Sequence, residues 1–169
     1  MGEYDYKSAL NSYQTPERAA RYKKFQETNR WGSFVTLREQ KAVARELRKY
    51  KWGTSDQLLD IPCGTGILGR ILHNFPFKII ASDISEEMMA LAKEAYPEDR
   101  LIECIKKDIT NTSFPRQSFA CVITLGFLHL VPPEIKRDTL KEIAALTTRV
   151  AIVSCSVDTP LQRIKKRMT

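Results

Sequence analysis

Hydrophobic and polar positions divide the chain into two parts with different periods. Residues 16–29 and 37–50 are expected to be helical: Thr15 before Pro16 is a favourable start for the first, and the second places apolar side chains roughly at helical spacing with charges between them. From residue 57 onward, short apolar runs alternate with helical segments. Such alternation predicts an α/β fold, a parallel sheet covered by helices on both faces.

The apolar runs predict five strands, at residues 57–61, 77–82, 101–106, 119–125 and 149–156. The intervening segments predict helices over 67–74, 85–96 and 132–146, followed by a short basic helix over 160–168. The length of 169 residues fits one domain with a sizeable core. We expect residues 1–52 to form an N-terminal helical layer and residues 53–169 to form the α/β core.

A glycine-rich turn, Asp60-Ile-Pro-Cys-Gly-Thr-Gly66, directly follows the first predicted strand. Gly64 and Gly66 remove side chains where the backbone must turn sharply and approach a ligand closely. A helix beginning at Ile67 would point its free N–H groups at the same place. Because open α/β sheets bind ligands at the carboxyl ends of their strands, this turn marks the candidate site.

Acidic residues also follow the next two strands. Asp83 lies about twenty residues past the glycine turn, where an acid suits the hydroxyls of a ribose. At the end of the third strand, Asp108 can accept from an exocyclic amine while Ile109 packs on an adenine ring. Each acid alone is compatible with a cap or a turn, but three at successive strand ends indicate a nucleoside-containing ligand.

Two cofactor classes fit part of this pattern. Gly64-Thr-Gly-Ile-Leu-Gly69 matches the dinucleotide pattern G-x-G-x-x-G. Asp60 argues against a dinucleotide, because a carboxylate just before the loop is poorly placed beside a pyrophosphate and well placed beside a cation. S-adenosylmethionine has an ammonium and a sulfonium and no phosphate, so it is the favoured cofactor.

Four motifs in order carry a family resemblance: Leu58-Leu-Asp-Ile-Pro-Cys-Gly-Thr-Gly66, Ala81-Ser-Asp-Ile-Ser-Glu-Glu-Met-Met-Ala-Leu-Ala92, Lys107-Asp-Ile109 and Phe119-Ala-Cys-Val-Ile-Thr-Leu-Gly-Phe-Leu-His-Leu-Val-Pro132. Over residues 57–156 the chain resembles class I methyltransferases of the small-molecule, ubiquinone/menaquinone-biosynthesis type. The resemblance implies a Rossmann-like open sheet, S-adenosylmethionine as methyl donor, S-adenosylhomocysteine as product, and a small-molecule acceptor. It implies cofactor contacts at Asp60, Pro62, Cys63, Gly64, Thr65, Gly66, Asp83, Ile84, Met88, Asp108, Ile109, Thr124 and Leu125.

The family usually continues past the fifth strand through another helix and a final β-hairpin, whereas this chain stops at Thr169. We therefore expect an exposed strand edge that favours association with a second copy or with a partner chain. A non-catalytic or partner-dependent binding module is the alternative function that follows from this departure.

Two side chains near the expected methyl donor have reactive chemistry. His129 follows the fourth strand and is a candidate general base. A packed strand-end role is its alternative, because in-line methyl transfer often needs little beyond positioning. Cys63 is interpreted as a small residue beside the ligand rather than as a nucleophile. No metal site or disulfide framework is indicated by the spacing of the cysteines, Cys63, Cys104, Cys121 and Cys155.

The net charge of +7 is uneven. Residues 1–52 carry twelve Lys/Arg against six Asp/Glu, residues 53–130 seven against ten, and residues 131–169 eight against four. Basic ends keep a nucleic-acid methyltransferase as a third option. Its Asn-Pro-Pro-Tyr or Asp-Pro-Pro-Tyr signature is missing after the fourth strand, so nucleic acid is not favoured.

No apolar run approaches the ~20 residues of a bilayer span, and no secretory signal is evident, so we expect a cytoplasmic protein.

Overall fold

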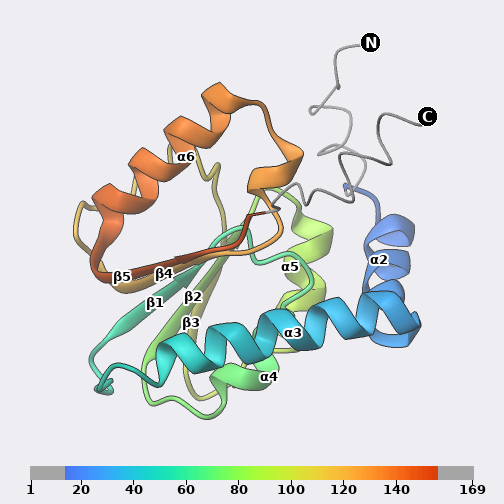
Figure 1. The fold of residues 1–169 in the computed structure, drawn as a ribbon, viewed down its shortest axis with the longest axis horizontal. Helices are drawn as coiled ribbons and strands as arrows, with labels where there is room; N and C mark the ends of the chain where they lie inside the picture. The colour runs from blue at the N-terminus through green and yellow to red at the C-terminus, as the bar shows by residue number, and fades with distance from the viewer. Residues whose placement is uncertain (1–13, 156–169) are drawn as a thin grey trace, which may run out of the picture.

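The computed structural model describes residues 14–155, drawn in colour in Figure 1, so the helix expected over residues 160–168 lies outside the described residues. The elements in chain order are α2 Pro16–Thr28, α3 Arg30–Leu47, β1 Gln57–Asp60, α4 Gly69–Leu72, β2 Lys78–Asp83, α5 Glu86–Lys93, β3 Leu101–Lys106, β4 Phe119–Thr124, the 3-10 turn η1 Leu128–Leu130, α6 Pro133–Leu146 and β5 Thr147–Val153. Across these residues, no helix has the length and apolar character that crossing a membrane requires.

The five strands form one sheet in the order β3-β2-β1-β4-β5, and every neighbouring pair is parallel. The chain adds strands outward from β1 to β3 and then returns to place β4 on the other side of β1. The strand order therefore reverses between β1 and β4, the place where open α/β sheets form a ligand crevice. The predicted Rossmann-like parallel sheet is confirmed.

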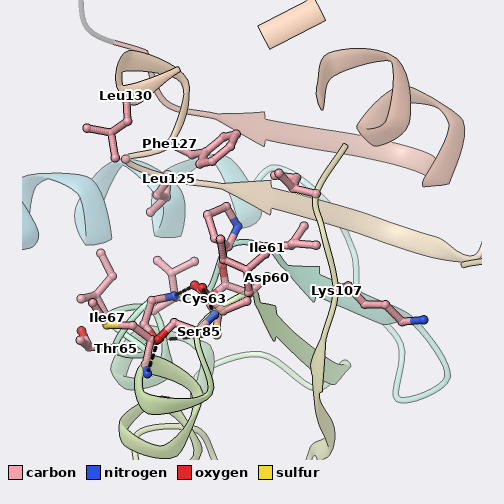
Figure 2. A pocket seen from close by; sticks show the side chains of 18 of the residues that line it. Asp60, Ile61, Cys63, Thr65, Ile67, Ser85, Lys107, Leu125, Phe127 and Leu130 are labelled. Carbon is pink, nitrogen blue, oxygen red and sulfur yellow. Dashed lines mark hydrogen bonds between the residues drawn. The ribbon is translucent and has the colours of Figure 1, made fainter. Parts of the chain in front are cut away.

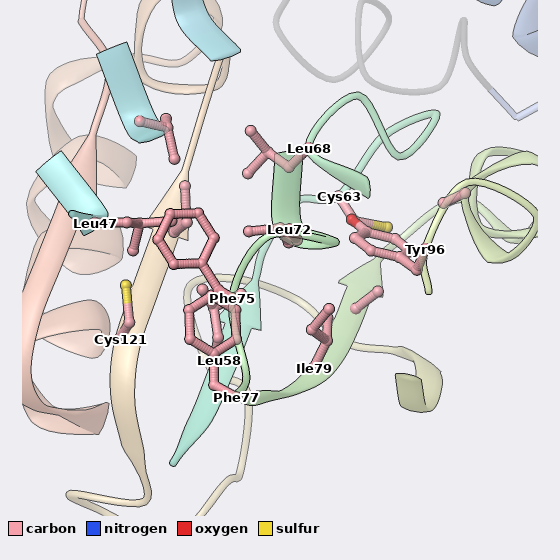
Figure 3. Packing of buried hydrophobic residues seen from close by; sticks show 14 of the residues in the cluster. Leu47, Leu58, Cys63, Leu68, Leu72, Phe75, Phe77, Ile79, Tyr96 and Cys121 are labelled. Atoms are coloured by element: carbon pink, nitrogen blue, oxygen red, sulfur yellow. The ribbon is translucent and has the colours of Figure 1, made fainter. Parts of the chain in front are cut away.

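Helices cover both faces of the sheet, as Figure 1 shows, with α6 on one side and α3, α4 and α5 on the other. Leu58 packs with Leu47 and Leu72 in the cluster of Figure 3, while Leu59 packs with Ile143 in the cluster beneath α6. Successive residues of a strand point to opposite faces, and both faces of the central strands β1 and β4 are buried, whereas the edge strands β3 and β5 are partly exposed. This explains why the strands read as continuous apolar runs rather than as alternating ones.

The helix after the glycine turn differs from its prediction. The expected span was 67–74, but α4 contains only four residues, Gly69–Leu72. Gly66 has φ +77°, which a right-handed helix cannot include, and tight turns close Gly66 N–H onto Cys63 O at 3.0 Å and Gly69 N–H onto Gly66 O at 2.9 Å. The helix after the turn therefore begins at Gly69 rather than at Ile67 and is shorter than expected.

The second N-terminal helix begins earlier than its hydrophobic pattern indicated. The predicted start was residue 37, whereas α3 begins at Arg30. The Asn29 side chain caps it by accepting from the N–H groups of Trp31 and Gly32 at 3.0 and 3.2 Å. A Cβ on Gly32 would lie 2.3 Å from the Phe25 carbonyl oxygen, so glycine allows α2 and α3 to meet at this corner.

Candidate functional site

One cavity opens at the carboxyl ends of β1, β2 and β4, and Figure 2 shows it from close by. It collects residues from all four of the sequence motifs. The predicted cofactor contacts that line it are Asp60, Pro62, Cys63, Gly64, Thr65, Asp83, Ile84, Met88, Asp108, Ile109 and Leu125. Two more predicted contacts, Gly66 and Thr124, and the candidate base His129 are not among the lining residues.

Asp83, at the end of β2, ties the glycine turn to the start of α5. Its Oδ2 accepts from the N–H of Gly64 at 2.9 Å, and its Oδ1 accepts from the N–H of Ser85 at 3.0 Å. Burial raises the pKa of this carboxyl, and the backbone donors act in the opposite direction. Each carboxylate oxygen has a second lone pair, so Asp83 can also accept from ligand hydroxyls.

Asp60, at the end of β1, is buried and has a different environment. Its Oδ2 accepts a short hydrogen bond from the Tyr96 hydroxyl. Burial raises the pKa of Asp60 to about 7; the Tyr96 hydrogen bond lowers it, and the charge of Asp83 raises it further. The ionised form of this carboxyl could pair with a cation, the role that the sequence suggested for this position.

Asp108 forms the third acidic position around the cavity. Its Oδ1 accepts from both the backbone N–H and the hydroxyl of Thr110, at 2.8 and 2.7 Å. These bonds engage Oδ1, and among the described residues no hydrogen bond reaches Oδ2. The neighbouring Ile109 is buried and lines the same cavity.

Gly66 and Thr124 act behind the cavity wall. A Cβ on Gly66 would lie 2.8 Å from the Cα of Ala92, so this glycine lets the turn pack directly on α5. The buried Thr124 hydroxyl donates to the Ile61 carbonyl at 2.8 Å and links β4 to the residue that follows β1. Both residues shape the site through their neighbours.

The two reactive side chains have contrasting positions. His129 is exposed on η1, and the structure does not bring it to the cavity. Phe127 and Leu130, from the same segment, line the cavity instead, beside Leu125 (Figure 2). Cys63 lines the cavity, but burial raises the pKa of its thiol well above the ordinary value, so the nucleophilic thiolate is disfavoured.

The N-terminal helices supply lining residues that the motifs did not identify: Tyr22 and Gln26 from α2 and Glu39 from α3. The Thr65 hydroxyl donates to Gln26 Oε1 at 2.6 Å, and the Gln40 amide donates to the Ile67 carbonyl at 2.6 Å. These bonds hold the helical layer against the glycine turn. Burial raises the pKa of Glu39.

The cavity combines the three strand-end acids and Glu39 with apolar side chains such as Ile84 and Met88. Such a lining suits a ligand that carries a cationic group, adjacent hydroxyls and a flat ring. Within residues 14–155, no cluster of three or more His, Cys, Asp or Glu side chains is arranged to hold a metal ion.

Comparison with known proteins agrees with this geometry. A demethylmenaquinone methyltransferase of Clavibacter sepedonicus is 28% identical over 106 residues, which are 62% of this chain and 42% of that protein. The chain thus spans less than half the length of this curated relative.

Two solved structures show the same fold at low sequence identity. The magnesium protoporphyrin IX methyltransferase of Synechocystis with bound S-adenosylhomocysteine superposes with a TM-score of 0.77 at 18% identity, over 97% of this chain and 78% of that one. An S-adenosylmethionine-dependent methyltransferase from Thermotoga maritima has a TM-score of 0.67 at 19% identity, over 94% and 67%. Finally, the family model described as a methyltransferase domain matches residues 58–149, more than half of the chain. The chain therefore belongs to the methyltransferase domain family.

Proposed function

We propose that this chain is an S-adenosylmethionine-dependent methyltransferase that acts on a small molecule. The observation that carries the proposal is the convergence of Asp60, Asp83 and Asp108 on one cavity beside the glycine turn. Family membership supports it, as do the names of the similar proteins, which include methyltransferases for demethylmenaquinone and magnesium protoporphyrin IX.

The lining residues fit the three parts of this cofactor. Asp83 would accept the ribose hydroxyls, and Asp108 would accept the adenine amine through its free oxygen. Ile84, Met88 and Ile109 would pack against the adenosine. An ammonium group would meet the Asp60 carboxyl, where no protein cation is paired in the part of the chain that the structure describes.

The acceptor would occupy the apolar side of the cavity, formed by Leu125, Phe127, Leu130 and Ile135. The cofactor, when bound, supplies an electrophilic methyl group on its sulfonium. The side chains of the chain would then orient the acceptor and exclude water, which is enough for in-line transfer to an activated methyl group. This lining favours a small acceptor with a substantial apolar part over a nucleic acid.

The same proposal gives the helical layer and the α/β core different roles. Residues 1–52 would cover the site, supported by Tyr22, Gln26 and Glu39 in its lining, and residues 53–169 would hold the cofactor. Association through the edge strand β5 stays a prediction, which sedimentation of the full chain over a range of concentrations tests.

A turnover assay tests the proposed function. The full chain is incubated with methyl-labelled S-adenosylmethionine and pools of small metabolites and lipids, and both products are followed by mass spectrometry. We expect S-adenosylhomocysteine and a labelled acceptor in equal amounts. Folded chain that forms neither product with any pool would contradict the proposal.

A further inference from the structure

Two buried carboxyls share the cavity but differ in what stabilises their charge. Asp83 accepts from two backbone N–H groups, those of Gly64 and Ser85. Among the described residues, the only hydrogen-bond donor to the Asp60 carboxyl is the neutral hydroxyl of Tyr96. Because several N–H donors favour the ionised form of a carboxyl and burial opposes it, Asp60 is the one that tends to keep a proton.

Tyr96 is fixed in place by packing rather than by its hydrogen bond. Its ring is buried in the cluster of Figure 3, beside Cys63 and behind the glycine turn. A Cβ on Gly69 would lie 2.1 Å from the carbonyl oxygen of Ala95, so two close glycine contacts, at Gly66 and Gly69, bring this part of the chain against the turn. The hydroxyl therefore meets Asp60 across 36 residues of sequence without needing to move.

Among residues 14–155, the other groups around Asp60 do not neutralise a negative charge there. The thiols of Cys63 and Cys121 stay neutral, because burial raises the pKa of Cys63 well above its ordinary value and that of Cys121 to about 12. Asp83 and Glu39, which line the same cavity, add negative charge when ionised. The cation in the lining, Lys107, lies 5.3 Å from the centre of the Phe114 ring.

We propose that Tyr96 is a positioning residue for Asp60, and that arrival of the cofactor's ammonium group at Asp60 is coupled to release of a proton from its carboxyl. This inference rests on the proposed function. The O–H bond of the carboxyl breaks, the proton passes to solvent, and the carboxylate pairs with the ammonium while Tyr96 continues to donate to it. No oxidant or further reactant is involved.

The coupling fixes the sign of the pH dependence. A protonated Asp60 must lose its proton before it pairs with the ammonium, so cofactor affinity is weakest at low pH and levels off above the pKa of about 7. Between about pH 5.5 and about pH 7, the affinity should rise roughly fifteenfold. The ligand's own amino group, with a pKa of ~7.7–8.0, stays protonated over most of this range.

Calorimetry with two ligands tests the coupling. S-adenosylhomocysteine carries the ammonium, whereas 5′-methylthioadenosine keeps the adenine and ribose and lacks it. Each ligand is titrated into the full chain near pH 6.5 in two buffers with different ionisation enthalpies, which counts the protons released. We expect S-adenosylhomocysteine to release roughly 0.7 proton more than 5′-methylthioadenosine, the fraction of a group of pKa about 7 that is protonated at that pH.

Three variants locate the effect. Asp60→Asn should abolish the extra proton release, and Glu39→Gln should retain it. The hydrogen bond from Tyr96 lowers the pKa of Asp60. Tyr96→Phe removes this bond, so the midpoint of the S-adenosylhomocysteine profile should shift to higher pH. Tyr50→Phe, at an exposed tyrosine, is the matched control and should leave both ligands unaffected.

The outcomes separate this inference from the proposed function. Equal proton release by the two ligands, or release that survives Asp60→Asn and is lost in Glu39→Gln, overturns the coupling and leaves the methyltransferase proposal standing. A Tyr96→Phe variant that weakens both ligands alike without moving the midpoint has only a structural defect and overturns the positioning role. If the folded wild type binds neither ligand, both the proposed function and the coupling are refuted.

Discussion

Replacing Gly66 or Gly64, two glycines of the same turn, by alanine should affect different properties of the protein: fold stability in one case and ligand binding in the other. Gly66 has φ +77°, and its added Cβ would lie 2.8 Å from the Cα and 2.9 Å from the carbonyl oxygen of Ala92. Gly64 has φ +52°, but no heavy atom lies within 4 Å of its added Cβ, and the residue lines the cavity. Gly66→Ala should therefore disturb the packing of the fold, whereas Gly64→Ala should reduce the space for a ligand.

The magnitudes follow from these contacts. An L-residue in the left-handed region costs about 1–2 kcal/mol, and overpacking against backbone atoms adds about 1–3 kcal/mol. Gly66→Ala should therefore lower the free energy of unfolding by about 2–5 kcal/mol, and Gly64→Ala by about 1–2 kcal/mol. In the cavity, the extra methyl group of Gly64→Ala should weaken S-adenosylhomocysteine binding by about 1–3 kcal/mol, roughly tenfold for each 1.4 kcal/mol.

Equilibrium unfolding in urea and calorimetric titration measure the two effects on the same proteins. Gly53→Ala is the control, since its added Cβ would lie 3.8 Å from its nearest neighbour, the Ser55 hydroxyl oxygen, and the stability should change by less than about 1 kcal/mol. A Gly64→Ala variant that loses as much stability as Gly66→Ala, or a Gly66→Ala variant that is as stable as the control, would refute these separate roles.

Three further predictions concern the helical layer, His129 and nucleic acid. A double-mutant cycle of Gln26→Ala and Thr65→Val should give a coupling of about 0.5–1.5 kcal/mol in urea unfolding, because the two side chains share a 2.6 Å hydrogen bond; additive effects would show that this bond does not hold α2. His129→Ala should leave the turnover rate unchanged, since the exposed side chain does not line the cavity, and a large loss would restore the general-base hypothesis. RNA and DNA should not bind in a gel-shift assay at low salt, where electrostatic binding is strongest; tight binding there would favour the nucleic-acid alternative.

The sequence predicted the strands and the strand-end acids because both leave local signals. An apolar run followed by an acid identified Asp60 and Asp83, and the structure places both in one cavity. The extent of a helix after the turn was less predictable, because Ile67 and Leu68 have helical spacing but follow a glycine with positive φ.

Contacts between distant residues explain most of what the sequence did not reveal. Tyr96 meets Asp60 across 36 residues, and Gln26 meets Thr65 across 39, with no periodic pattern to relate them. Gly64 and Gly66 belong to one motif and look equivalent in sequence. Only the position of Ala92 on α5 shows that the second glycine serves packing while the first faces the cavity.

Calorimetric titration of S-adenosylhomocysteine into the wild type and Asp83→Ala tests the central claim most directly, with Asp138→Ala, at an exposed acid of α6, as the control. Circular dichroism first establishes that each protein is folded, since Asp83 also bonds Gly64 and Ser85. We predict clear binding by the wild type and the control, and a loss of about 1–3 kcal/mol in Asp83→Ala, the scale of a hydrogen bond to a charged group. A folded wild type that does not bind, or binding that Asp83→Ala leaves unchanged, would contradict the cofactor site described for this cavity.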